Sequence, residues 1–217
     1  MTTGPELPAF SDARGPGGPD AAASIPLVHA VAVFGSSRAA EGSHTYREAY
    51  ALGRALAGAG LVVVNGGYCG VMAAVARGAK EAGGRTLGIT VALFPGRVPN
   101  PWLDEVVHAP TLFARLEEFT CRADAFVALC GGIGTLLELS LVWNLSQTGA
   151  LGNKPVVLLG QHWTPLLRAL RRHTSISDED LALFRRAHTA TDVVRLLRGP
   201  SAAGGGGRDT PSPGGAG

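Results

Sequence analysis

Apolar and polar positions along the chain fall into two kinds of segment that alternate. Six short runs are apolar at nearly every position and predict strands that are buried on both faces. Between them lie segments with apolar residues at helical spacing, which predict helices. The predicted strands are residues 28–34, 61–64, 86–93, 105–110, 125–129 and 155–160, and the predicted helices are residues 46–59, 72–82, 112–122, 136–147, 163–173 and 191–198, the last with Thr191 as its N-cap.

This alternation predicts a single doubly wound, Rossmann-like α/β domain with a parallel sheet flanked by helices. Residues 1–27 and 199–217 are rich in Pro, Gly and Ala and contain little that can pack, so both predict disordered tails. The folded domain is therefore expected over residues 28–198. A hydrophobic content of 46% in 217 residues is enough for one core.

Composition narrows the class of protein. A formal charge of +2 does not favour nucleic acid or an anionic membrane as the main partner. The three cysteines match no metal-ligand spacing, and the six histidines form no cluster, so no metal is expected. No apolar run reaches the roughly 18 residues of a membrane span, and the N-terminus lacks the apolar region of a signal peptide. These features predict a soluble, cytoplasmic protein.

Three predicted strands end in glycine-rich turns: "FGSSR" (34–38), "NGGYCG" (65–70) and "CGGIGT" (130–135). The carboxyl ends of parallel strands meet at one edge of the sheet, where ligands of such folds bind. Glycine lets a ligand approach the backbone closely, and free amides at a helix start suit a phosphate. The candidate nucleotide-binding residues in these turns are Gly35, Ser36, Gly66, Gly67, Gly131, Gly132, Gly134 and Thr135.

The kind of ligand follows from what the turns lack. No lysine follows a glycine-rich loop as in a P-loop, and the dinucleotide pattern G-x-G-x-x-G is absent. The turns therefore suggest a mononucleotide-sized ligand. The alternative is that each turn uses glycine only for the geometry of a tight strand-to-helix corner.

Glu138 and Arg115 are the charged residues of interest. Glu138 follows Thr135 by three residues, so it is expected one turn into the helix, facing either a bound sugar or only the positive end of the helix dipole. Arg115 is expected on the preceding helix, where it can also pair at the surface with Glu117 or Glu118. The residues alone leave both pairs of alternatives open.

The stretches "NGGYCGVMAAVARGAKEAGG" (65–84) and "ADAFVALCGGIGTLLE" (123–138), with Arg115 between them, resemble the LOG family. Its members are often labelled lysine decarboxylase-like, and the characterised ones are cytokinin riboside 5′-monophosphate phosphoribohydrolases. The resemblance implies that Arg115 and Glu138 are the catalytic pair. It also implies that the glycines and threonine of "GGIGT" bind the phosphoribosyl group, that Asn144 contributes to the site, and that the chain forms a homodimer.

The sequence departs from the family pattern near the motif. Cys130 replaces a proline, Leu116 replaces a lysine, and Leu137 replaces a first glutamate. The loop "LFPGRVPNPWLDE" (93–105) is also longer and richer in proline than the pattern. These departures leave the Arg115 and Glu138 positions intact.

Two functions of different classes remain. The first is hydrolysis of the N-glycosidic bond of AMP or a cytokinin riboside monophosphate, with no cofactor. The second is nucleotide or cofactor binding without turnover. Pyridoxal phosphate chemistry requires a Schiff-base lysine, and the two lysines, Lys80 and Lys154, are expected mid-helix and at the far end of a strand. Decarboxylation is therefore rejected.

Overall fold

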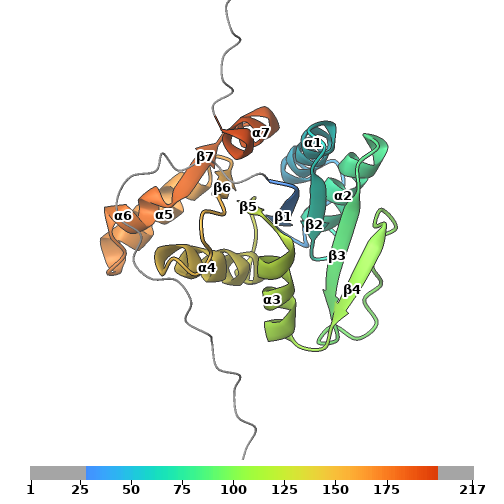
Figure 1. Cartoon of the computed structure of the whole chain (residues 1–217), viewed down its shortest axis with the longest axis horizontal. Helices are drawn as coiled ribbons and strands as arrows, with labels where there is room; N and C mark the ends of the chain where they lie inside the picture. The colour runs from blue at the N-terminus through green and yellow to red at the C-terminus, as the bar shows by residue number, and fades with distance from the viewer. Residues whose placement is uncertain (1–27, 200–217) are drawn as a thin grey trace, which may run out of the picture.

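Seven parallel strands form one sheet in the computed structural model, which describes residues 28–199 (Figure 1). The strands are β1 (Ala30–Phe34), β2 (Val62–Asn65), β3 (Thr86–Val91), β4 (Glu105–Ala109), β5 (Ala125–Ala128), β6 (Val156–Leu159) and β7 (Phe184–Ala187). Their order across the sheet is β4-β3-β2-β1-β5-β6-β7, so the chain builds outward from β1 in one direction and then from β5 in the other. The reversal between β1 and β5 is the position at which such sheets open a crevice for ligands.

Helices cover both faces of the sheet. They are α1 (His44–Gly58), α2 (Val71–Glu81), α3 (Leu112–Arg122), α4 (Ile133–Gln147), α5 (Trp163–His173), α6 (Asp178–Ala182) and α7 (Ala190–Arg198). One core cluster joins the sheet to α1, α2 and α7, and the other joins it to α3, α4 and α5. Figure 1 shows α1, α2 and α7 on one side and α3 and α4 on the other. The Rossmann-like α/β architecture is confirmed.

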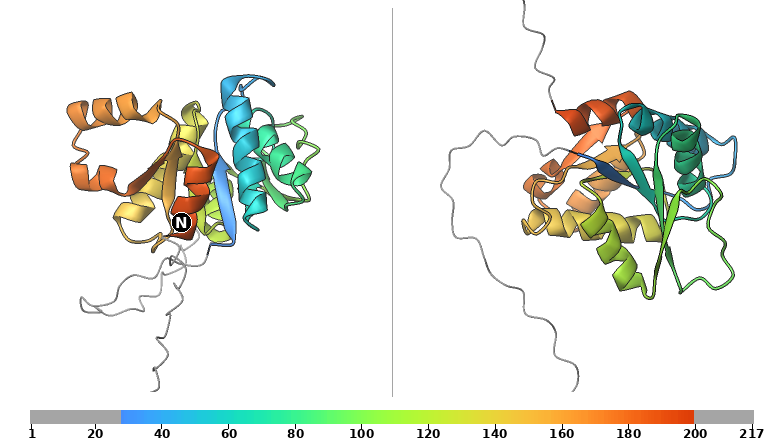
Figure 2. Two further views of the ribbon diagram at one scale, coloured as in Figure 1. Left: turned by 90° about the horizontal axis from the view of Figure 1, so that it is seen from above. Right: turned by 45° about the vertical axis from the view of Figure 1, so that its right-hand side comes forward.

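Helices α1 and α2 pack unusually closely on their face of the sheet, and Figures 1 and 2 show them side by side. A Cβ on Gly53 would lie 2.1 Å from the carbonyl oxygen of Val75, and one on Gly78 would lie 2.1 Å from that of Tyr50. Only glycine permits this backbone approach. The packing fixes the start of α2, which follows the second glycine turn.

Each of the six predicted strands and six predicted helices is present, and no predicted end differs from the observed one by more than three residues. Two short elements were not predicted: α6 and the edge strand β7, whose sequence "FRRA" contains two arginines. The predicted tails at 1–27 and 200–217 lie outside the described residues.

The structure corrects the predicted start of α4 and the predicted N-cap of α7. Helix α4 begins at Ile133, not Leu136, so Glu138 lies in its second turn. Thr189, not Thr191, caps α7, because its hydroxyl accepts from the Asp192 amide while the Asp192 carboxylate accepts from the Thr189 amide. This reciprocal capping box is unavailable to Thr191, since the residue three positions later is Val194.

Among residues 28–199, no helix is long and apolar enough to cross a membrane. The cytoplasmic location stays a prediction.

Candidate functional site

A cavity of about 1050 Å³ opens at the carboxyl edge of the sheet, over the ends of β1, β2 and β5. The first turns of α4 form one wall, and the loop after β3 contributes to another. Its volume is at the upper end of the range of small-molecule sites. The three glycine turns singled out in the sequence therefore do meet at one cavity.

The start of α4 forms the wall of the cavity beside β5. Gly132 is its N-cap and supplies no side-chain acceptor, so the first amides of the helix lack protein partners. Thr135 is 4% exposed and lines the cavity beside Gly131. A Cβ on Gly131 would lie 2.1 Å from the Thr135 hydroxyl oxygen, so this position requires glycine. The free amides and the positive end of the helix dipole make this wall suitable for an anion.

The turn after β1 lies directly beside that wall. The Ser36 amide donates to the carbonyl oxygen of Cys130 at 3.0 Å and joins the first and third glycine turns. Gly35 packs so tightly on α2 that a Cβ there would lie 2.5 Å from a methyl group of Val71. Both Gly35 and Ser36 line the cavity, as does the exposed Arg38.

The turn after β2 forms the floor. The Asn65 side-chain oxygen accepts from the Gly67 amide at 2.8 Å and bends the chain, and Gly67 takes a φ of +82°. Gly66 lines the cavity, whereas Gly67 packs against Thr90 of β3. Gly67 therefore shapes the turn, and Gly66 faces the ligand space.

Arg115 and Glu138 form a buried ion pair that lines this cavity. The Arg115 Nη1 and Glu138 Oε1 atoms are 2.9 Å apart, and the two residues are 6% and 9% exposed. Arg115 also donates from Nε to the Ile89 carbonyl at 2.7 Å and from Nη2 to the Gly66 carbonyl at 3.4 Å. Its guanidinium carbon lies 5.0 Å from the centre of the Phe119 ring. These contacts hold the guanidinium in one orientation, which in turn orients the carboxylate.

The electrostatics of Glu138 follow from this burial. Removal from water raises the pKa of Glu138 above its ordinary value, and the Coulomb attraction and hydrogen bond of Arg115 oppose that rise. Burial is the larger effect, so the carboxyl group holds its proton to a higher pH than an exposed glutamate does. A carboxyl group with a raised pKa in a cavity is typical of a functional site.

The surface alternative for Arg115 does not occur. Arg122, not Arg115, makes the ion pair with Glu118 on α3. Sequence reasoning left this choice open because the register of α3 against the sheet decides which side of the helix is buried.

Asn144 does not line the main cavity. It lines a smaller one of about 170 Å³ with Trp143 and Asp180. The Trp143 indole packs against Phe184 and donates to the Asp180 carbonyl, as expected of a packing residue. A nucleotide-binding role for Asn144 stays a prediction. Within one chain, Asn144 is not among the residues that line the main cavity.

The cavity carries an excess of positive charge. Its charged lining residues are Arg38, Arg97 and Arg115 against the single carboxylate of Glu138. Neither lysine of the chain lines it: Lys80 pairs with Asp104, and Lys154 donates to the Thr120 carbonyl. Among residues 28–199, no group of three or more His, Cys, Asp or Glu side chains is placed to hold a metal ion.

The charged and aromatic cavity residues that sequence reasoning missed include Arg38, Tyr68, Phe94 and Arg97. Arg38 and Tyr68 fall inside the quoted glycine turns, and the unusual length of the 93–105 loop was the available signal for Phe94 and Arg97. Cys130 also lines the cavity and is exposed.

Comparisons with known proteins agree on one family and one fold. Residues 72–197 match the family model described as "Possible lysine decarboxylase". The cytokinin riboside 5′-monophosphate phosphoribohydrolase of Mycobacterium tuberculosis is 36% identical over 110 residues, which are 50% of this chain and 58% of that protein. The chain thus matches little more than half the length of that relative. The probable phosphoribohydrolase LOGL1 of Oryza sativa, named for the same reaction, is 34% identical over 174 residues, covering 77% of this chain and 78% of that protein.

A solved structure shares the fold. The molybdenum cofactor binding protein from the phototrophic bacterium Rippkaea orientalis superposes with a TM-score of 0.63 at 26% identity, over 80% of this chain and 97% of that one.

Proposed function

We propose that this chain, which belongs to the LOG family (the family described as possible lysine decarboxylases), hydrolyses the N-glycosidic bond of a nucleoside 5′-monophosphate. The products are the free base and ribose 5-phosphate. The observation that carries the proposal is the buried Arg115–Glu138 pair, which lines the same cavity as the uncapped start of α4.

The phosphate of the substrate binds at the start of α4. The amides that follow Gly132 and the Thr135 hydroxyl donate to it, and Arg38 adds positive charge at the edge of the cavity. Binding energy from this remote group fixes the ribose in position for reaction. The net positive charge of the cavity supports an anionic ligand of this kind.

Glu138 acts on the sugar. Departure of the base leaves an oxocarbenium-like ribose, and a carboxylate beside it stabilises the positive charge or orients the attacking water. In this reaction the bond between the base nitrogen and C1′ breaks, a water oxygen bonds to C1′, and the base takes up a proton. Arg115 orients Glu138 and supplies no proton, because a guanidinium stays protonated near neutral pH.

The placement of the lysines supports hydrolysis over the decarboxylation that the family description suggests. A pyridoxal phosphate enzyme needs a lysine at its site for the Schiff base. Lys80 and Lys154 are engaged with Asp104 and the Thr120 carbonyl, and both lie outside the cavity.

A second candidate is nucleotide or cofactor binding without turnover. It is favoured by the structural likeness to a molybdenum cofactor binding protein and by Leu137, an exposed cavity residue where the LOG pattern has another glutamate. In that case the cavity keeps its phosphate site, and Glu138 contributes to affinity alone.

The proposal includes a homodimer. Four large apolar residues in the first turns of α3 and α4 are exposed: Phe113 is 84% exposed, Ile133 85%, Leu137 42% and Leu136 36%. Exposed apolar residues of this kind are typical of an interface between subunits. Light scattering after size exclusion is expected to give twice the mass of one chain for the wild type. For Ile133→Glu it is expected to give the mass of one chain.

The function is tested by base release. The purified chain is incubated with AMP, isopentenyladenosine 5′-monophosphate, GMP and IMP, and free base and ribose 5-phosphate are quantified by chromatography. We expect equal amounts of the two products from at least one nucleotide, and none from the matching nucleoside without phosphate. No product from any nucleotide, together with a raised melting temperature in their presence, would support the binding protein instead.

A further inference from the structure

The loop between β3 and β4 forms the wall of the cavity opposite the start of α4. Phe94 and Arg97 of this loop line the cavity together with Tyr68 from the second glycine turn. Strand β3 lies three positions from β5 in the sheet, and neighbouring strands are about 4.8 Å apart. This wall is therefore roughly 14 Å from the start of α4, which follows β5. A mononucleotide whose phosphate sits at α4 therefore directs its base toward this wall.

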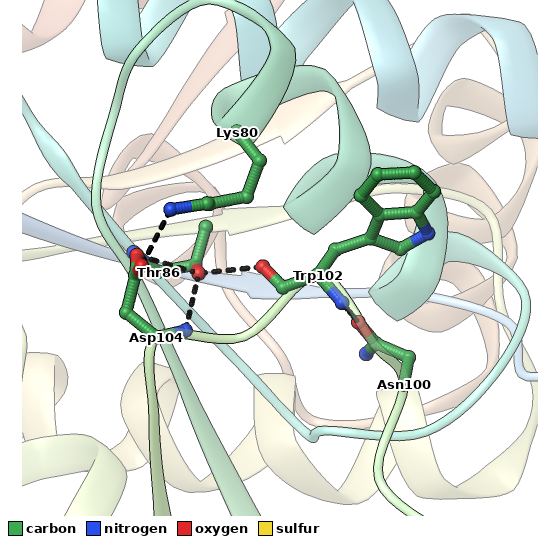
Figure 3. A network of polar contacts seen from close by, with 5 residues as sticks. All are labelled: Lys80, Thr86, Asn100, Trp102 and Asp104. Atoms are coloured by element: carbon green, nitrogen blue, oxygen red, sulfur yellow. Dashed lines mark hydrogen bonds and ion pairs between the residues drawn. The ribbon is translucent and has the colours of Figure 1, made fainter.

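The loop is fastened firmly at its far end. Asp104 pairs with Lys80 of α2 and accepts from the Thr86 amide at 2.9 Å, and the Thr86 hydroxyl donates to the Trp102 carbonyl at 2.7 Å (Figure 3). The Asn100 side-chain oxygen accepts from the Trp102 amide in the same network (Figure 3). These contacts tie the returning half of the loop to β3 and α2.

The loop is also tied to the second glycine turn. The Asn100 amide donates to the Gly67 carbonyl at 2.8 Å, and its side-chain nitrogen donates to the Tyr68 carbonyl at 3.0 Å. The Tyr68 hydroxyl accepts from the Val91 amide and donates to the Val91 carbonyl, at 3.0 and 3.2 Å. Tyr68 is thus a fixed surface on which the tip of the loop rests.

Phe94 and Arg97 stack on that surface. The rings of Phe94 and Tyr68 meet edge to face with centres 5.9 Å apart. The Arg97 guanidinium carbon lies 5.0 Å from the Phe94 ring centre and 5.8 Å from that of Tyr68. Within residues 28–199 Arg97 makes no ion pair, so its planar group of donors is held by aromatic rings without a carboxylate partner.

We propose that this wall is the base-recognition site, in which Phe94 stacks on the base and Arg97 selects a 6-oxopurine, the base class of GMP and IMP. The inference rests on the proposed function and narrows its substrate class. The proposed substrate class differs from the cytokinin riboside monophosphates, which are adenine nucleotides, in the names of its relatives.

The selectivity follows from the donor pattern of arginine. A guanidinium offers only donors, in a fork that matches the adjacent O6 and N7 acceptors of guanine or hypoxanthine. Adenine places an amino donor where those bases carry O6, so the same fork meets a like group. Glutamine, with one donor and one acceptor, instead matches the N6 and N7 positions of adenine. Arg97→Gln is therefore expected to change selectivity without removing polarity.

The test measures nucleotide affinity by calorimetry in the Glu138→Gln chain, in which base release is expected to be slow. GMP and IMP are expected to bind about tenfold more tightly than AMP. Adding Arg97→Gln is expected to abolish or reverse this ratio, whereas Phe94→Ala weakens GMP and AMP alike by about tenfold through lost stacking. Arg172→Gln, at an exposed arginine of α5 outside the cavity, is the matched control and keeps the wild-type ratio.

The outcomes separate the two proposals. If the wild-type chain releases no base from any nucleotide, the affinities are measured on the wild type itself, and a preference for GMP that needs Arg97 still supports the recognition site. AMP binding as tightly as GMP overturns it. The proposal is also overturned if Arg97→Gln weakens binding of ribose 5-phosphate as much as it weakens binding of GMP, because Arg97 would then hold the phosphate.

Discussion

Replacement of Arg115 by methionine tests whether the buried ion pair has the energetics that its geometry implies. The substitution keeps most of the apolar stem and leaves Glu138 without its charged partner at a site that is 9% exposed. Removing one partner of a buried pair costs about 3 to 5 kcal/mol, because the remaining charge is uncompensated. For a domain of this size that loss lowers the melting temperature by about 6 to 20 °C.

The loss depends on pH in a defined direction. Burial raises the pKa of Glu138 above its unfolded value, and removing Arg115 takes away the effect that opposes this rise. A carboxyl group with a raised folded-state pKa favours folding in its protonated form, so its contribution is full below the unfolded pKa and is lost as pH rises through the folded pKa. The Arg115→Met chain is therefore least stable, relative to the wild type, at high pH, and the difference shrinks on acidification.

The assay is urea unfolding of four chains at two pH values: wild type, Arg115→Met, Glu138→Leu and the double variant. An apolar pair of similar volume often replaces a buried ion pair at no cost, so the double variant is expected to recover most of the stability that Arg115→Met loses. A loss below about 1 kcal/mol in both single variants would refute the reasoning, since it would mean that water screens the pair. A double variant as unstable as the sum of the single ones would refute the coupling.

Three further predictions concern the cavity. Gly131→Ala is expected to weaken ribose 5-phosphate binding and to lower the melting temperature, because the new Cβ would lie 2.1 Å from the Thr135 hydroxyl oxygen. Gly132→Ala, whose Cβ would meet nothing within 4 Å, is expected to keep the melting temperature; calorimetry and thermal melts check both variants. The kcat/KM for base release is expected to fall on acidification, with a midpoint above 4.5, the ordinary pKa of glutamate. The reason is that Glu138 must be ionised to act and that burial raises its pKa. A midpoint at or below 4.5 would argue against a role for Glu138 in the reaction. Tyr68→Phe removes the two hydrogen bonds to the β3 backbone and is expected to cost about 1 to 3 kcal/mol in urea unfolding; an unchanged midpoint would mean that the ring alone holds the wall.

The five central strands were predictable because they are apolar at nearly every position, as strands buried on both faces of a sheet are. The same rule explains the miss at β7, where an edge strand keeps two arginines, Arg185 and Arg186, and so shows no apolar run. The start of α4 was placed late because glycine is a poor helix former, yet Gly134 lies within the first turn. Tertiary packing of Thr135 overrides that local preference.

Several residues of the site could be predicted from the sequence, but the contacts between them could not. The glycine turns and Glu138 carry local signals, and a resemblance pointed to Arg115. That Arg115 reaches Glu138 across 23 residues depends on how α3 and α4 dock on the sheet, which no local pattern encodes. The wall of Tyr68, Phe94 and Arg97 depends in the same way on the contacts of Asn100 with the second glycine turn.

The most direct test of the central claim compares nucleotide affinity with base release in the wild type and Glu138→Gln. A residue that acts on the transition state is expected to change the rate and leave ground-state binding nearly intact. We expect base release to fall by about 10² to 10⁴-fold in Glu138→Gln while the Kd for the nucleotide changes little. An equal loss in both quantities, or base release that survives the substitution, would contradict a catalytic role for Glu138.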